Sequence, residues 1–183
     1  YLTFDDGPTP EITDWVLQLL KKYSATASFF CIGKNILDNP ELFRRIIANG
    51  HTIGNHTHNH LNGWKTTTAS YVENFDACSL SISEVNRDSS NTRLFRPPYG
   101  KIKRSQAKAI KAKGYEIIMW DVLSADFDQS ITKEKCLDNI LSNIKPGSIV
   151  VFHDSVKAFT NLEYVLPVTL KFIEQHNYKY GVL

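Results

Sequence analysis

Short apolar runs alternate with amphipathic segments along the whole chain, and this alternation constrains the fold more than any other feature. Residues 25–32 are rich in apolar side chains, as expected of a buried strand. Residues 40–48 then carry apolar side chains at helical spacing, and Asn49-Gly50 ends that segment. Such an alternation is typical of an α/β domain built on a parallel sheet.

The sequence predicts about seven strands and about six helices. The expected strands are residues 2–4, 25–32, 51–53, 94–95, 115–122, 148–152 and 179–182. The expected helices are residues 10–20, 40–48, 68–87, 105–113, 132–143 and 162–176.

The length favours a single domain over residues 1–183, because no linker, repeat or low-complexity segment divides the chain. A full eight-stranded (β/α) barrel usually takes about 250 residues. We therefore predict an α/β fold in the form of a distorted, incomplete (β/α) barrel of about seven parallel strands. An open doubly wound sheet is the structural alternative.

Composition excludes several classes of function. A net charge of +2 is too small to predict binding to nucleic acid or to an anionic membrane. No run approaches the roughly 20 apolar residues that a membrane-spanning helix needs, so we expect no transmembrane segment. The chain begins abruptly in a strand, which we interpret as a trimmed mature domain. The sequence gives no indication of the oligomeric state.

The three cysteines, Cys31, Cys78 and Cys136, cannot all pair, and none has C-x-x-C spacing. Cys31 lies in an apolar run and Cys78 on the apolar stripe of the longest expected helix. We interpret all three as small buried hydrophobic side chains.

Chemically distinctive residues follow five of the expected strands. They occupy positions 5–6, 56–60, 96–99, 121–126 and 153–154. In parallel α/β folds the carboxyl ends of the strands form the active-site face. We therefore expect these five segments to converge on one site.

Asp5-Asp6 and the histidine cluster together favour a metal-dependent hydrolase. His56 and His60 are four residues apart, so both rings would face the same way on a helical turn. With a carboxylate they would form a His-His-Asp site with open positions, which is a catalytic zinc arrangement. The alternatives are a strand that presents His58 with the other two histidines, a solvated loop, or an oxygen-ligand site for calcium.

Arg96 and His153 are candidates for the remaining catalytic roles. Arg96 enters a turn stiffened by two prolines, where it could orient a catalytic carboxylate while a backbone N–H beyond the prolines faces an oxyanion. It could equally be a surface arginine. His153 could be a general acid whose tautomer is set by Asp126, or a satisfied core histidine.

In order along the chain, these segments resemble the motifs of the polysaccharide deacetylase family, the NodB-homology carbohydrate esterases of family 4. Residues 3–8 match its first motif residue for residue, and residues 56–60 match its His-(Ser/Thr)-x-x-His metal motif. Residues 96–99 are similar to its Arg-x-x-Pro-Tyr type of motif but are one residue shorter. Residues 123–127 keep part of its Asp-x-x-Asp-Trp motif, and residues 151–153 correspond to its Leu-x-His motif.

The resemblance implies a role for each matching residue. Asp6, His56 and His60 would bind one divalent metal, usually zinc and in some cases cobalt or nickel. The catalytic residues implied are Asp5 as general base, Arg96 as its partner, the Tyr99 backbone N–H in the oxyanion hole, His153 as general acid, and Asp126 as the residue that tunes it. The family fold is a distorted (β/α) barrel.

The departures from the family pattern concern the acetyl pocket. Phe127 stands where the family has tryptophan, Val151 where it has leucine, and Leu123 where it has a carboxylate. We therefore expect Phe127 and Val151 to bind the acetyl methyl with altered selectivity. Trp64 could stack on a sugar ring or belong to the core.

The sequence and the resemblance together predict a metal-dependent deacetylase of N-acetylated amino sugars in peptidoglycan, chitin-like or poly-N-acetylglucosamine chains. The enzymatic alternative is an esterase that removes O-acetyl groups from xylan-like chains. The other alternative is a glycan-binding module without catalysis. The family chemistry implies a location in the cell envelope or outside the cell.

Overall fold

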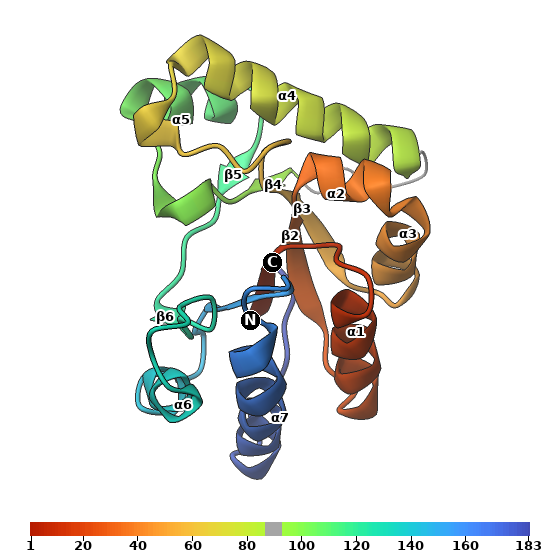
Figure 1. Cartoon of the computed structure of the whole chain (residues 1–183), viewed down its shortest axis with the longest axis vertical. Coiled ribbons are helices and arrows are strands. Elements are labelled where there is room, and N and C mark those ends of the chain that lie inside the picture. The colour runs from red at the N-terminus through yellow and green to blue at the C-terminus, as the bar shows by residue number, and fades with distance from the viewer. Residues whose placement is uncertain (87–92) are drawn as a thin grey trace.

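A computed structural model describes residues 1–86 and 93–183. Seven strands form one sheet in the order β5-β4-β3-β2-β1-β7-β6, and all neighbouring strands are parallel. The sheet curls, but its two edge strands do not pair, so the barrel is incomplete (Figure 1). This confirms the predicted fold class and the number of strands. The strands are β1 (Leu2–Asp6), β2 (Ala27–Cys31), β3 (Thr52–Asn55), β4 (Leu94–Phe95), β5 (Glu116–Ile117), β6 (Val122–Leu123) and β7 (Val150–His153).

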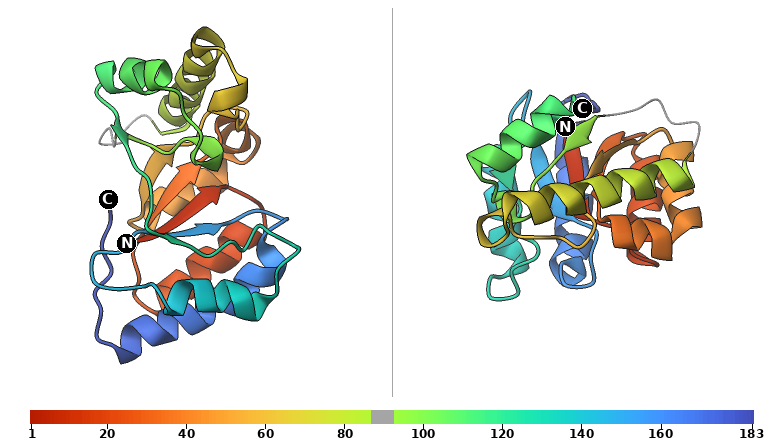
Figure 2. Two further views of the ribbon diagram at one scale, coloured as in Figure 1. Left: turned by 90° about the vertical axis from the view of Figure 1, so that its left-hand side faces the viewer. Right: turned by 90° about the horizontal axis from the view of Figure 1, so that it is seen from above.

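Helices cover the outside of the curled sheet (Figure 2). Figure 1 shows α4 and α5 on one side of the strands and α1, α6 and α7 on the other. Along the described part of the chain, no helix is both long and apolar enough to cross a membrane. The helices are α1 (Ile12–Lys22), α2 (Gly33–Asp38), α3 (Pro40–Ala48), α4 (Thr68–Val85), α5 (Arg104–Ala112), α6 (Lys133–Leu141) and α7 (Phe159–Gln175), with short 3-10 turns η1 (Gly63–Lys65) and η2 (Pro98–Gly100).

The strand predicted over residues 115–122 is wrong as a single element. It is divided into β5 and β6, which lie at opposite edges of the sheet. The backbone between them crosses the open side of the barrel, where the Ile118 and Met119 carbonyls accept hydrogen bonds from the buried Arg96 guanidinium at 3.3 and 3.5 Å. These carbonyls bind a side chain instead of a neighbouring strand, so no strand continues through them.

The terminal strand predicted over residues 179–182 is also wrong, because that segment joins no sheet. The strands near it already have partners on both sides, and the chain end is fixed instead by the Leu183 N–H, which donates to Ser28 Oγ at 3.2 Å. The six-residue helix α2 was not predicted, since it is too short to show a helical period. Helix α4 ends at Val85, and the predicted end at Arg87 lies outside the described residues.

Apolar side chains from the sheet and the helices form two clusters. In the larger one, the Phe4 ring stacks on Phe29 and Phe152 with ring centroids 5.0 and 5.6 Å apart. The smaller one joins Phe75 of α4 to Phe95 of β4 and to α5. The cysteines are free and buried, as predicted. The core therefore fixes the sheet beneath the strand ends that carry the polar residues.

Leu20→Ala should lower the free energy of unfolding by about 2–5 kcal/mol, because Leu20 of α1 is fully buried in the larger cluster. Leu80→Ala is the matched control: Leu80 of α4 is 69% exposed, so its truncation should change stability by less than about 0.5 kcal/mol. Urea denaturation measures both. Equal effects of the two substitutions would contradict the packing described.

Candidate active site

The polar residues at the strand ends converge on a pocket of about 480 Å³. β1 supplies Asp5 and Asp6, the loop after β3 supplies His56 and His60, and β7 supplies His153. The pocket is lined by Asp5, Asp6, His56, His60, Tyr99, Trp120, Leu123, Phe127, Val151, His153, Ser155 and Lys157. Arg96 and Asp126 lie directly behind this surface, fully buried.

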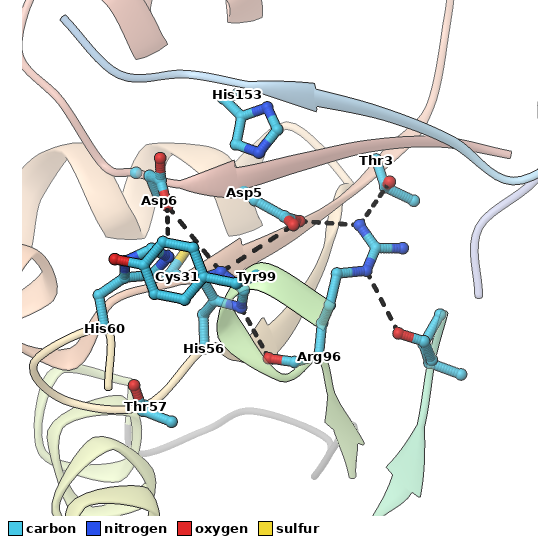
Figure 3. Close-up of polar contacts among 12 residues, drawn as sticks. Thr3, Asp5, Asp6, Cys31, His56, Thr57, His60, Arg96, Tyr99 and His153 are labelled. Atoms are coloured by element: carbon cyan, nitrogen blue, oxygen red, sulfur yellow. Dashed lines mark hydrogen bonds and ion pairs between the residues drawn. The ribbon is translucent and has the colours of Figure 1, made fainter. Parts of the chain in front are cut away.

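Asp6, His56 and His60 form a group that can hold a metal ion. One ligand atom from each lies within 4.8 Å of the other two. Asp6 Oδ1 lies 3.3 Å from His60 Nε2 and 3.9 Å from His56 Nε2, and Figure 3 shows the three side chains facing one another. Asp6 Oδ1 is buried and has no hydrogen-bond partner, so a cation at this point would supply the missing interaction. Oxygen and imidazole donors of this kind suit zinc.

Hydrogen bonds on the far side of each imidazole orient it for metal binding. His56 Nδ1 lies 2.7 Å from the Arg96 carbonyl oxygen, so this nitrogen carries the proton and Nε2 presents its lone pair. His60 Nδ1 lies 3.1 Å from the Tyr99 hydroxyl. Burial lowers the pKa of His56, and it lowers the pKa of His60 to about 4. Both rings are therefore neutral at pH 7, as metal ligation requires.

The segment from His56 to His60 is a loop and not a helical turn. Thr57 and His60 adopt left-handed backbone conformations with φ of 61° and 54°. The Thr57 hydroxyl accepts a hydrogen bond from the Leu61 N–H at 3.1 Å, which closes the loop. His58 points elsewhere, with Nδ1 3.3 Å from Ser81 Oγ. The loop thus brings two of its three histidines to Asp6.

Asp5 is held by Arg96 beside the metal-binding group. Arg96 Nη1 donates to Asp5 Oδ1 and to Thr3 Oγ1, both at 2.7 Å (Figure 3). The other carboxylate oxygen, Asp5 Oδ2, lies 3.9 Å from His56 Nε2 and so faces the group. Burial alone would raise the pKa of Asp5, but the charge and hydrogen bond of Arg96, together with the charge of His153, outweigh burial and lower the pKa below its usual range. Asp5 is therefore an ionised carboxylate with one oxygen left free.

His153 lies across the pocket and is bound to Asp126. Its Nδ1 is 2.7 Å from Asp126 Oδ1, and its backbone N–H donates to Asp126 Oδ2 at 2.9 Å. Burial lowers the pKa of His153, but the Asp126 charge and hydrogen bond, with Asp5 and Asp6 nearby, raise it to about 9. The ring is therefore an imidazolium at neutral pH, with its Nε2 proton left for another acceptor.

Tyr99 presents both its ring and its backbone to the site. Its φ is 60°, in the left-handed region, within the turn that follows Arg96-Pro97-Pro98. No acceptor in the described residues binds the Tyr99 N–H, which leaves this donor available. The Tyr99 ring packs on His60 with centroids 4.5 Å apart.

One wall of the pocket is apolar. Phe127 and Val151, which the resemblance assigns to the acetyl pocket, line it, and the Phe127 ring meets the His153 ring edge-on with centroids 4.9 Å apart. Trp120 also lines the pocket, although it falls within the strand predicted over residues 115–122. Ser155 and Lys157 line it too, and their position just after His153-Asp154 was the only sequence signal for them.

Trp64 does not line this pocket and is not in the core. Its side chain is 62% exposed, so the core alternative is wrong. The indole N–H donates to the Ile102 carbonyl at 3.3 Å, and the Lys101 ammonium lies 5.4 Å from the ring. Tyr99, which lines the pocket, is two residues from Lys101 along the chain.

The chain is similar in sequence to several known deacetylases. A peptidoglycan-N-acetylglucosamine deacetylase from Bacillus cereus is 33% identical over 180 residues, covering 98% of this chain and 83% of that protein. A chitooligosaccharide deacetylase from Azorhizobium caulinodans is 34% identical over 154 residues, covering 84% and 72%. A second Bacillus cereus protein with the same name as the first is 35% identical over 156 residues, and the chain spans 55% of its length.

The fold is also that of a solved relative. The crystal structure of a peptidoglycan N-acetylglucosamine deacetylase in complex with 4-naphthalen-1-yl-N-oxidanyl-benzamide superposes with a TM-score of 0.92. The sequence identity is 28%, and the match covers all of this chain and 84% of the other. Residues 1–118 match the family model described as Polysaccharide deacetylase. The chain therefore belongs to the polysaccharide deacetylase family.

Proposed function

We propose that this protein is a metal-dependent hydrolase that removes N-acetyl groups from the amino sugars of a glycan. The observation that carries the proposal is the convergence of three units on one pocket: the Asp6–His56–His60 group, the Asp5–Arg96 ion pair and the His153–Asp126 pair. A divalent ion, most simply Zn²⁺, would be held by Asp6, His56 and His60, where it would activate water and polarise the acetyl carbonyl.

The residues around the metal-binding group supply the proton transfers. Asp5, kept ionised by Arg96, accepts a proton from the attacking water through its free oxygen. His153, kept protonated by Asp126, donates its Nε2 proton to the departing amine nitrogen. The unpaired Tyr99 N–H stabilises the oxyanion. The apolar wall formed by Phe127 and Val151 receives the acetyl methyl group.

The relatives support an amino-sugar substrate in a cell-wall or chitin-like glycan. Two are named for peptidoglycan and one for chitooligosaccharide. We propose the same substrate class here, and with it action outside the cytoplasm. The exposed rings of Tyr99 and Trp64, the latter beside the Lys101 ammonium, would bind a neighbouring sugar of the glycan.

Acetyl removal should require metal. Zinc-loaded and chelator-stripped protein are incubated with N-acetylglucosamine oligomers, peptidoglycan fragments and acetylated xylan, and mass spectrometry records the loss of acetyl groups from each substrate. We expect loss from an amino sugar with zinc only. Loss from xylan alone would replace the proposal with an O-acetyl esterase, and no loss from any substrate would favour a binding module.

Asp5→Asn tests the role of the base in the same assay. Because Asp5 is proposed as the base and not as a ligand, the variant should bind zinc as the parent does while turnover falls by about 10²–10⁴-fold. Unchanged turnover would refute the role of Asp5. Parallel loss of zinc would instead make Asp5 a metal ligand.

The alkaline limb of the pH–rate profile should depend on Asp126. His153 must be protonated to act as an acid, so activity persists below its pKa of about 9 and is lost as the pH rises through that value. Asp126→Asn removes the negative charge that raises the pKa of His153, while burial continues to lower that pKa. The alkaline limb of the profile should therefore move to lower pH. The profile of kcat/KM, with NMR titration of His153 in metal-free protein, measures the shift. An unmoved limb would remove His153 from the role of acid.

Trp64→Ala should raise KM for oligomers of four or more sugars by roughly two- to tenfold, which corresponds to the loss of one aromatic contact. The disaccharide should be unaffected, because its second sugar would not reach the ring. Leu80→Ala, an exposed apolar truncation on α4, is the control. Equal KM values for Trp64→Ala and the parent on long oligomers would remove Trp64 from the substrate site.

A further inference from the structure

Asp154 is a fully buried carboxylate that the catalytic roles above do not use. It directly follows His153 at the end of β7. Its backbone N–H donates to the Asp5 carbonyl at 3.1 Å, so it extends the pairing of β7 with β1 by one step. Its side chain therefore lies against the segment that follows β1.

Both side-chain oxygens of Asp154 accept hydrogen bonds from the segment that follows β1. Oδ1 accepts a hydrogen bond from the Gly7 backbone N–H at 3.0 Å. Oδ2 accepts one from the Thr13 hydroxyl at 2.5 Å, and the Thr13 oxygen in turn accepts the Thr9 N–H at 2.8 Å. The carboxylate thus ties residues 7, 9 and 13 to the end of β7.

The fit between Asp154 and Gly7 is close. A Cβ atom on residue 7 would lie 2.0 Å from Asp154 Oδ2, well inside van der Waals contact. No side chain other than that of glycine fits here while the carboxylate stays in place. The contact therefore fixes where the backbone passes immediately after Asp6.

Asp6 needs such support because its backbone is strained. Its φ is 86°, a left-handed value that costs a non-glycine residue free energy and that surrounding contacts must hold. The Asn35 amide donates to the Asp6 carbonyl at 2.8 Å, and Asp154 accepts a hydrogen bond from the Gly7 N–H at the other end of the same peptide group. This backbone conformation directs Asp6 Oδ1 toward His56 and His60.

We infer that Asp154 is a positioning residue for the metal: by holding the Gly7 peptide it keeps the Asp6 carboxylate in the orientation that faces His56 and His60. The inference rests on the metal site of the proposed function and is independent of which glycan is cleaved.

Zinc affinity of the whole chain, measured by competition with a chromophoric chelator, tests the inference without any substrate. Asp154→Ala leaves the Gly7 N–H without its acceptor, and we expect zinc to bind about 10–100-fold more weakly. Asp154→Asn keeps an acceptor for Gly7 but not for the Thr13 hydroxyl, so its affinity should fall between that of the parent and that of Asp154→Ala. Gly7→Ala, which displaces the carboxylate, should reproduce the loss.

Thr169→Val is the control for a purely structural effect. Thr169 is buried and its hydroxyl donates to the Val165 carbonyl at 2.8 Å within α7, away from the metal-binding group. This variant should lower the melting temperature and leave zinc affinity unchanged.

Zinc affinity within twofold of the parent in folded Asp154→Ala would overturn the inference. If that variant does not fold, Asp154→Asn decides by the same criterion. A parent that binds zinc but releases no acetyl group from any glycan would refute the proposed function, and weaker zinc binding by the Asp154 variants would then still support the inference. A parent that binds no zinc would overturn both.

Discussion

The buried ion pair between Arg96 and Asp5 is the interaction on which the geometry of the site depends. Arg96 is fully buried, and its guanidinium binds Thr3 and Asp5 of β1 and two carbonyls of the segment between β5 and β6. Its own carbonyl accepts a hydrogen bond from the His56 Nδ1–H. Arg96, the residue that follows β4, therefore joins the proposed base, a proposed metal ligand and the open side of the barrel. Removing one partner of such a pair leaves an uncompensated buried charge, which lowers the free energy of unfolding by about 3–5 kcal/mol.

The parallel sheet explains why distant segments can share these contacts. Each strand ends at the same edge, so the residues after β1, β3, β4 and β7 meet there although up to 147 positions separate them. The hydrogen bonds behind the pocket then set protonation states. Arg96 keeps Asp5 ionised, Asp126 keeps His153 protonated, and burial keeps His56 and His60 neutral. These protonation states are the ones that the proposed base, acid and metal ligands require.

The sequence was sufficient for elements and residues with a local signal. Apolar periodicity located most strands and helices, and the Asp5-Asp6 pair could be grouped with His56 and His60 because both segments follow a strand. The choice of Asp6 over Asp5 as the ligand came from the family resemblance. The sequence was insufficient where a contact between residues far apart in the chain determines where a strand ends or what a side chain binds. The break between β5 and β6 depends on Arg96, which binds backbone carbonyls 22 and 23 residues away. Trp120 enters the pocket only because of that break, and Asp154 gains its contacts with Gly7 and Thr13 only through the pairing of β7 with β1.

We propose that Asp6, His56 and His60 form an open metal site beside an Asp5 that is reserved for proton transfer. Anomalous X-ray diffraction at the zinc edge, from crystals of the zinc-loaded protein, tests it most directly. We predict one strong peak bound by one oxygen of Asp6 and by Nε2 of both histidines, with Asp5 still paired to Arg96. A peak elsewhere, or one ligated by Asp5 in place of Asp6, would contradict the account.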